Sequence, residues 1–232
     1  MRERPILWSA PMVLALLAGR KTQTRRLVKC PSTTTALRYV VDHEAVPAGR
    51  YTGWLVECDA PLALPLKAYA EVGERLWGRE TWRTIEIGAP EASRLGLAPG
   101  TDGVRFAADG TFKSIDATAA AADLWVEAHD NGKHGVKWRP SIFMPRWAAR
   151  LRHEVTAIRV ERLQDISEAD AIAEGIERSG DEPFPWSWPG SKSMWPTPVG
   201  CYLSGWDAIN GEGSAAKNPW VWVVSFKAVA HG

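Results

Sequence analysis

The stretch "LLAGRKTQTRRLVK", which runs from Leu16 to Lys29, decides how the rest of the chain is interpreted. Its apolar half stops at Gly19, and a glycine in that place is typical of the position that ends a helix. The half that follows contains no acidic residue and five cations, namely Arg20, Lys21, Arg25, Arg26 and Lys29. The sequence therefore raises the question of which anionic group these cations meet.

The neighbouring residues predict a short helix followed by a strand. Ser9 can cap the N-terminus of a helix, and Pro11 fits the first turn, where its missing N–H is not needed. We therefore expect a helix over Met12–Ala18 and an extended segment over Thr22–Val28.

Two explanations of the cations remain open. Cations just past the end of a helix interact favourably with its dipole and stabilise the helix by about 0.3–1 kcal/mol each. Cations on an edge strand oppose aggregation. The dipole explanation suits Arg20 and Lys21, because the effect fades within one turn. The other explanation also covers Arg25, Arg26 and Lys29, and it is an anionic or polar ligand held at the mouth of the fold.

The remaining expected elements are short and are separated by turns. Strands are predicted at Arg38–Val41, Gly73–Thr84, Val104–Ala107, His153–Leu163 and Pro219–Val229. Helices are predicted at Ser167–Gly175, where Ser167 and Asp170 have capping-box spacing, and at Tyr202–Ile209. Prolines make Lys137–Leu151 a loop with one helical turn after Pro145, and they make Glu182–Pro198 an irregular loop.

Strands separated by short helices, without a repeating strand-helix-strand unit, favour an α+β fold built on a small mixed β-barrel. We expect the 232 residues to form a single domain, 1–232, with short flanking helices. Insertions are expected at about 31–68, 88–135 and 180–200.

The composition excludes several classes of protein. Apolar residues make up 45% and charged residues 24% of the chain, which excludes wholesale disorder. The formal net charge is +1, so an anionic partner would have to meet a local basic surface. No apolar run reaches the ~18 residues of a membrane span. Three widely spaced cysteines suit a reducing compartment, so we expect a cytoplasmic protein with no membrane partner.

Neither a cofactor nor a metal is expected. The chain contains no glycine-rich phosphate loop and no metal signature. His129 and His134 lie close together, but no cysteine or second pair of carboxylates is available to complete a metal site.

Glu174 occupies an unusual position for a carboxylate. It is expected in the last turn of the helix that ends at Gly175, where the helix dipole disfavours negative charge. A solvated glutamate would tolerate this position at a small cost, and a lysine partner would explain it.

Three segments, "LLAGRKTQTRR", "ISEADAIAEG" and the closing apolar strand, together resemble the ASCH domain, a small barrel of the PUA-like class. The usual ASCH signature, Gly-x-Lys-x-x-Glu-x-Arg, is matched by Gly19, Lys21 and Arg26, and Thr24 replaces its glutamate. That replacement is similar to one ASCH subgroup, the N4-acetylcytidine amidohydrolases. The resemblance implies that Lys21, Thr24 and Glu174 are the catalytic residues.

The chain also resembles ASCH proteins of phages and prophages, in blocks such as "ERLWGRETW" and "WRPSIFMPRWAAR". The three insertions have no counterpart in the small amidohydrolases. The resemblance therefore implies a pocket for a nucleobase or nucleoside, and it leaves the substrate open.

The residues themselves are compatible with amide hydrolysis of N4-acylated cytidine or a related modified base. Thr24 would be the nucleophile, Lys21 its base, and Glu174 would orient the lysine or protonate the leaving amine. Residues three apart in a regular strand face opposite ways, so Lys21 and Thr24 converge only if the chain turns or bulges after Gly19.

Two other functions stay open. The first is a non-catalytic module that binds RNA or a modified base in DNA, with Arg20, Arg25 and Arg26 as contacts. The second is cleavage of single-stranded RNA, which is weakened because no histidine lies near the motif.

A second basic segment, Lys137–Arg162, interleaves cations with aromatic residues. Such a pattern suits bases stacked beside a groove for phosphates, although its tryptophans are equally explained as core. From this segment we expect Arg146 and Trp147 to contact nucleic acid. Trp186, Trp188 and Trp195 form either a lid or a partner surface, and the sequence does not decide between these.

Overall fold

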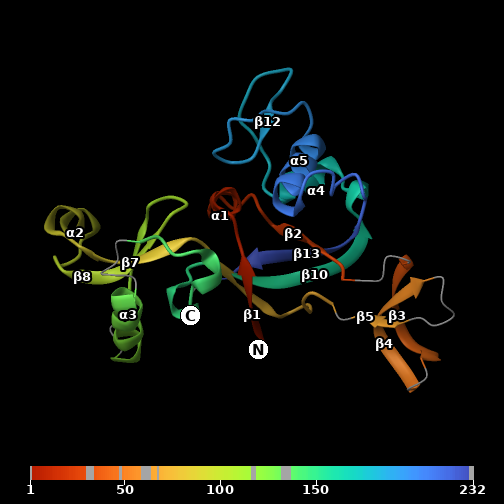
Figure 1. The fold of residues 1–232 in the computed structure, drawn as a ribbon, viewed down its shortest axis with the longest axis horizontal. Coiled ribbons are helices and arrows are strands. Elements are labelled where there is room, and N and C mark those ends of the chain that lie inside the picture. The colour runs from red at the N-terminus through yellow and green to blue at the C-terminus, as the bar shows by residue number, and fades with distance from the viewer. Residues whose placement is uncertain are drawn as a thin grey trace.

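The computed structural model describes residues 2–29, 34–46, 49–58, 64–66, 68–115, 119–131 and 137–229. Within these ranges the fold is mixed α+β, with four sheets and five α-helices (Figure 1). The predicted α+β class is therefore confirmed.

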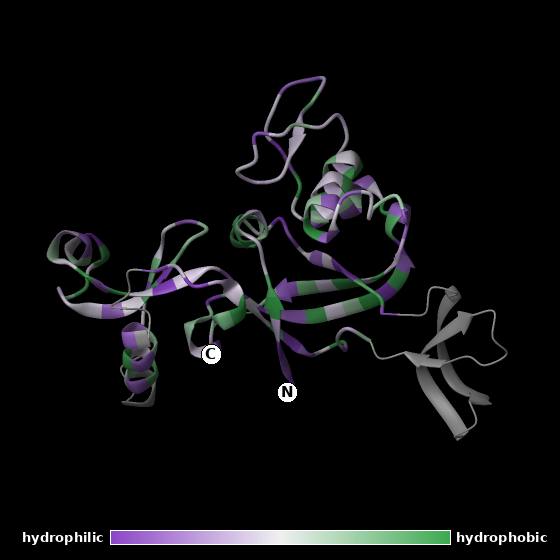
Figure 2. Cartoon of the chain, in the orientation of Figure 1, coloured by the Kyte–Doolittle hydropathy of each residue, from purple (hydrophilic) through white to green (hydrophobic). Residues whose placement is uncertain are grey.

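The largest sheet contains strands from the beginning, the middle and the end of the chain. Its order is β1 (Glu3–Leu7), β6 (Arg75–Arg79), β10 (Arg152–Arg162), β13 (Trp220–Ala228) and β2 (Gln23–Leu27). β1 and β6 are parallel, and the other neighbours are antiparallel. Figure 2 shows hydrophilic and hydrophobic bands along β10, as expected for a strand with two different faces.

The described strands of this sheet do not close into a barrel by hydrogen bonds, because β1 and β2 remain its two edges. The sheet nevertheless curves so that these edges approach each other. The guanidinium of Arg26 on β2 donates a hydrogen bond to the carbonyl of Leu7 at the end of β1, at 3.0 Å.

Helix α1 (Ala10–Leu17) and strand β2 form where the sequence predicts them. Ser9 is the N-cap and a proline lies in the first turn. Gly19 adopts φ +71°, and its N–H donates to the carbonyl of Leu16 at 3.0 Å. A left-handed residue in this place is favourable for glycine, and it turns the chain from the helix into the strand.

Both faces of β13 are buried, each against a different core. Trp222, Val224 and Phe226 pack in a cluster with residues of α1, β6 and β10. Val221 and Val223 pack on the other face, against α4 (Glu168–Ala173) and α5 (Pro198–Asn210). The predicted alternation along this strand is confirmed. As a result α1 packs on one side of β13, and α4 and α5 pack on the other.

The segments expected as insertions contain secondary structure of their own. The first holds a sheet of β3 (Thr34–Val46), β4 (Gly49–Cys58) and β5 (Leu64–Leu66). The second contributes to a sheet of β7 (Trp82–Ile87), β8 (Thr101–Phe106) and β9 (Phe112–Ser114), with α2 (Ala89–Leu95) and α3 (Ala119–Asn131). The third contains β12 (Trp186–Ser187), which pairs with β11 (Glu177–Arg178). Parts of the first two, including His134, lie outside the described residues.

The expected strand over Gly73–Thr84 is two strands, β6 and β7. Between them the carboxylate of Glu80 turns inward and pairs with Arg150 at 2.8 Å. At this point the chain leaves the main sheet and enters the sheet that contains β7. Single turns of 3₁₀-helix occur at Ser141–Phe143, Arg146–Ala148 and Leu163–Asp165, so the predicted helical turn after Pro145 is confirmed.

None of the described helices combines the length and the apolar character that would be needed to cross a bilayer.

Candidate functional site

A buried ion pair between Lys21 and Glu174 is the centre of the site. The Nζ atom of Lys21 lies 2.6 Å from Oε2 of Glu174, and the side chains are 0% and 1% exposed. Lys21 also donates to the backbone carbonyls of Gln23 and Glu174, both at 2.8 Å. Every proton of the ammonium therefore has an acceptor. The unusual position of Glu174 at the end of a helix is explained by a lysine 153 residues away.

The turn after α1 directs Lys21 toward this position. Beyond Gly19, the N–H groups of Arg20 and Lys21 both donate to the carbonyl of Ala15, at 2.9 and 3.2 Å. Lys21 thus precedes β2, so the alternation of a strand does not govern the direction of its side chain. A turn after Gly19 is therefore present, and it brings Lys21 to Glu174. The convergence of Lys21 with Thr24 stays a prediction.

The end of α4 is held against the same turn. Ser167 caps the start of this helix by accepting a hydrogen bond from the N–H of Asp170, at 3.1 Å. At the other end, the carbonyl of Ala173 accepts a hydrogen bond from the N–H of Thr22, at 2.9 Å. The backbone next to Glu174 is therefore held by this hydrogen bond, and the carboxylate of Glu174 is held by its ion pairs.

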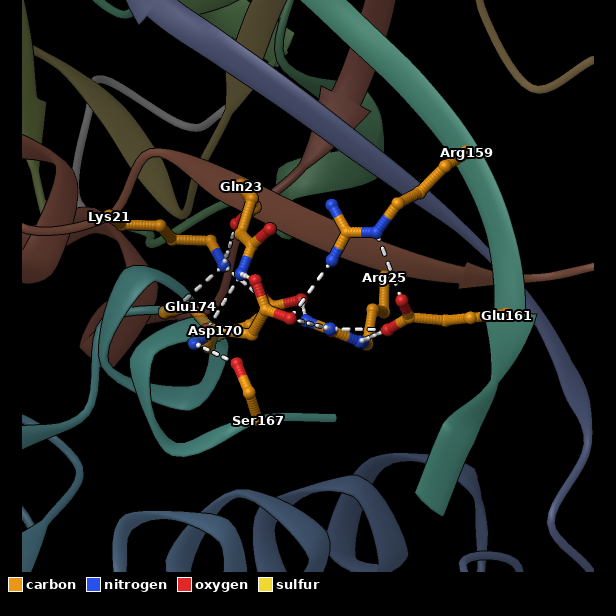
Figure 3. A network of polar contacts seen from close by, with 8 residues as sticks. All are labelled: Lys21, Gln23, Arg25, Arg159, Glu161, Ser167, Asp170 and Glu174. Carbon is orange, nitrogen blue, oxygen red and sulfur yellow. Dashed lines mark hydrogen bonds and ion pairs between the residues drawn. The ribbon is translucent and has the colours of Figure 1, made fainter. Parts of the chain in front are cut away.

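Arg25 extends the ion pair into a network of charges. Its guanidinium is 0% exposed and lies 2.5 Å from Glu161, 3.2 Å from Asp170 and 3.3 Å from Glu174. Figure 3 shows these side chains converging from β2, β10 and α4. The two oxygens of Glu174 are divided, with Oε2 on Lys21 and Oε1 on Arg25. This division fixes the orientation of the carboxylate.

The environment of Lys21 makes its ammonium a stronger acid than that of an exposed lysine. Burial lowers the pKa of Lys21 below its ordinary value, while Glu174 opposes that change, and the nearby charges of Arg26 and Arg25 lower the pKa further. Desolvation acts in this direction because it disfavours the charged form of an amine. A lowered pKa increases the fraction of neutral amine near neutral pH, and only a neutral amine is a base.

A cavity of about 100 Å³ opens beside the network, at the edge strand β2. Its polar wall includes Thr24, Arg25, Arg26 and Glu174, and its apolar wall includes Met12, Trp188, Tyr202, Trp206 and Ile209. Thr24 is only 1% exposed, so its hydroxyl is sheltered from bulk water. The predicted nucleophile and the predicted carboxylate therefore line one cavity, whereas Lys21, the predicted base, is not among its lining residues.

A histidine lies near the motif in space although none is near it in sequence. His153 on β10 is 4% exposed, and its ring packs edge-on against Phe226 at 4.8 Å and Trp8 at 6.4 Å between centroids. The Nζ of Lys21 lies 5.4 Å from the centroid of the same Trp8 ring. Burial and the charge of Lys21 lower the pKa of His153 to about 4, so this imidazole is neutral at neutral pH.

Acid is expected to destabilise the protein through His153. Its pKa falls from 6.5 in an exposed chain to about 4 in the fold, so between these pH values only the unfolded chain binds the proton. The contribution to the free energy of unfolding is complete above about pH 6.5 and is lost as the pH falls toward 4. Urea denaturation at pH 7 and pH 4.5 should show a smaller loss in His153→Phe than in the wild type. Equal losses in both proteins would contradict this assignment.

Arg20 and Arg26 differ in their distance from the cavity. Arg26 lines it, and its guanidinium stacks 5.4 Å from the centroid of Trp8. Arg20 forms an ion pair with Glu177 at 2.6 Å and is not among the residues that line the cavity.

Arg146 and Trp147 are not brought to this cavity either. Arg146 forms an ion pair with Glu3 of β1 and remains half-exposed. Trp147 packs edge-on against Trp82, with 6.0 Å between ring centroids. A nucleic-acid contact by these two residues would therefore use a different surface and stays a prediction.

Several residues of the site were not found by reasoning from the sequence, namely Gln23, His153, Glu161 and Tyr202, and Trp188 was named only as part of a lid or a partner surface. Gln23 lies inside the quoted motif, and its amide donates to Asp170 at 2.9 Å. The sequence carried no signal for it, because its burial and its hydrogen bonds are visible only in the structure. The other four depend on pairing between distant segments.

Comparisons of the chain with models of protein families, with curated proteins and with solved structures find no match. In the part of the chain that the structure describes, no group of three or more histidine, cysteine or acidic residues is arranged to hold a metal ion. The geometry of the site is therefore the basis for the function proposed below.

Proposed function

We propose that this chain is a PUA-like protein of the ASCH type whose cavity binds a nucleobase or nucleoside. The observation that carries the proposal is the buried Lys21–Glu174 pair, which adjoins the cavity that Thr24 lines. Burying two charges costs free energy, and buried charges beside a cavity commonly mark functional sites. The approach of β1 and β2 through Arg26 supports a barrel-like arrangement of the PUA-like kind.

The first function that we propose is hydrolysis of the amide in N4-acylated cytidine or a related modified base. The Thr24 hydroxyl adds to the acyl carbon while its proton passes to a neutral Lys21 amine. The carbon–nitrogen bond then breaks, and the exocyclic nitrogen leaves with that proton. A water molecule cleaves the resulting threonine ester, which releases the carboxylic acid and restores the hydroxyl. The cationic Arg26 in the same wall is suited to stabilising the oxyanion.

One observation favours a second function, which is binding without turnover. The Lys21 ammonium has three acceptors, at 2.6, 2.8 and 2.8 Å, and this arrangement holds the charged form in place. A charged lysine cannot accept a proton from a hydroxyl. In that case the site would be a rigid polar wall that binds RNA, or a modified base in DNA.

Incubation with N4-acetylcytidine separates the two functions. If the enzyme proposal holds, the wild type releases cytidine and acetate, and Thr24→Val or Lys21→Ala lowers the rate by about 10²–10⁴-fold. If no cytidine is released above the Lys21→Ala background, the hydrolase is excluded. Binding of a nucleoside or RNA without product, with affinity that falls steeply as salt rises, would instead support the binding module.

Two arginines give a matched comparison for the role of the cavity. Arg26→Ala removes a cation that lines the cavity, whereas Arg146→Ala removes one that lies outside it and pairs with Glu3. We expect Arg26→Ala to weaken nucleoside binding by about 10-fold, in keeping with ~1.4 kcal/mol for a charged hydrogen bond or stack. Arg146→Ala should leave the affinity within about 2-fold of the wild type, as is usual for surface changes away from a site. Isothermal titration calorimetry measures both, and equal losses would contradict the assignment of this cavity.

A further inference from the structure

Trp188 belongs to the third insertion, residues 180–200, and it lines the cavity. It directly follows β12, whose pairing with β11 joins the insertion to the chain just after Glu174. Trp186 and Trp195 exchange two backbone hydrogen bonds, at 2.8 and 3.1 Å, which close the loop behind Trp188. The loop that appeared irregular in sequence is therefore fixed at its base.

The indole of Trp188 occupies a place on α5 that is shaped for it. A Cβ atom added at Gly205 would lie 2.2 Å from Nε1 and 2.7 Å from Cε2 of this indole, so no larger residue fits there without moving the ring. The indole N–H donates to the carbonyl of Cys201 at 3.3 Å. The ring also lies 6.1 Å from Tyr202, at an angle of 40° between their planes. Three contacts with one helix thus determine the direction of the indole.

The segment that follows Trp188 extends from α5 toward α1. A Cβ atom added at Gly190 would lie 3.9 Å from the Leu14 side chain of α1. Met12, two residues earlier on α1, lines the cavity together with Trp188. Residues 188–190 therefore run beside the cavity between the two helices that flank it.

We infer that Trp188 determines the specificity of the cavity, as the wall against which a single aromatic ring of the ligand stacks. This inference rests on the proposed function, and it names the part of the ligand that enters. The cavity, of about 100 Å³, is of the order of the ~150 Å³ cavity that binds benzene. A space of this size suits one ring better than two, so we expect a monocyclic base beside Trp188 with its sugar at the mouth.

Aromatic rings and a guanidinium lie together in the lining of the cavity. The guanidinium of Arg25 lies 5.8 Å from the ring centroid of Tyr202, which adjoins Trp188. Stacking on an aromatic side chain contributes about 1–3 kcal/mol per base, as measured by substitution with alanine. Thr24 and Glu174 are among the polar residues that line the same cavity.

The test compares the binding of cytidine, N4-acetylcytidine and adenosine to the wild type and to Trp188→Ala by isothermal titration calorimetry. The wild type should prefer the pyrimidines. In the variant, affinity for the pyrimidines should fall about 5- to 100-fold, while affinity for adenosine should fall less or rise, because the wall that excludes a second ring is gone.

Gly205→Ala provides an independent test that leaves Trp188 in the chain. Alanine is a better helix former than glycine, so the variant should stay folded, and its thermal midpoint is the check. Its methyl group displaces the indole, so pyrimidine affinity should fall as in Trp188→Ala. In the double variant, Gly205→Ala should have no further effect, because there is no ring left to displace.

The outcomes distinguish the inference from the function on which it rests. If the wild type binds none of the three nucleosides, the proposed function and the inference fall together. If the wild type binds pyrimidines and Trp188→Ala binds them equally well, the inference is wrong and the proposed function stands. An effect of Gly205→Ala that persists in full in the double variant would also overturn the inference.

Discussion

Replacing Glu174 with alanine is expected to lower the free energy of unfolding by about 3–5 kcal/mol, because one partner of a fully buried ion pair is lost. The change leaves the ammonium of Lys21 inside the protein with carbonyl acceptors only, at a position where its side chain is 0% exposed. Arg25 loses a contact as well, although Glu161 and Asp170 still pair with it. Urea denaturation at pH 7 measures the difference.

The same helix offers a matched control for this substitution. Glu168 in the first turn of α4 is exposed, and Glu168→Ala should change stability by less than about 1 kcal/mol. The double variant Lys21→Met/Glu174→Leu removes both charges, and it should recover much of the stability that Glu174→Ala loses. A loss below about 1 kcal/mol in Glu174→Ala would mean that the carboxylate is not buried against the lysine in solution.

The elements that the sequence predicted correctly are those with local causes. The helix before Gly19 ends there because a glycine accommodates φ +71°, and that signal is present in the residue itself. The last strand shows its two faces in its own alternation, from Val221 to Phe226. The short helix after Ser167 is marked by its cap, which forms as the spacing indicates.

The features that the sequence did not predict depend on contacts between distant segments. The stretch from Gly73 to Thr84 has the composition of one strand, yet it divides between Arg79 and Trp82, where the carboxylate of Glu80 pairs with Arg150 from a distant segment. The order of the five-stranded sheet likewise follows from packing on both faces of β13. No local pattern carries this information.

In the candidate site too, some residues could be recognised from local sequence and others depend on contacts between distant segments. Glu174 was recognisable because a carboxylate at a helix C-terminus is unfavourable, and an unfavourable charge needs a partner. Lys21 is that partner, at 2.6 Å. The positions of His153 and Trp188 follow from sheet register and from the fit of an indole against Gly205, so neither was accessible to reasoning from residue types alone.

Replacing Gly175 with alanine is expected to destabilise the protein by about 2–5 kcal/mol, since two effects add. Gly175 adopts φ +109°, which L-residues rarely adopt, and an added Cβ would lie 2.7 Å from the Cβ of Ala15 on α1. The same atom would lie 3.4 Å from the Cβ of Lys21. The methyl group therefore separates α4 from the turn that carries the lysine, and the Lys21–Glu174 contact should weaken with it.

Two variants separate the backbone effect of Gly175→Ala from the steric one. Gly19→Ala also replaces a glycine with positive φ, at +71°, but nothing lies within 4 Å of the new methyl group, so only about 1–2 kcal/mol should be lost. Ala15→Gly added to Gly175→Ala removes the clash, and the double variant should be more stable than the sum of the two single changes predicts. Strict additivity, measured by urea denaturation, would show that α1 and α4 do not approach each other at this point. In that case the turn would no longer explain how a lysine near the N-terminus reaches a carboxylate at the end of α4.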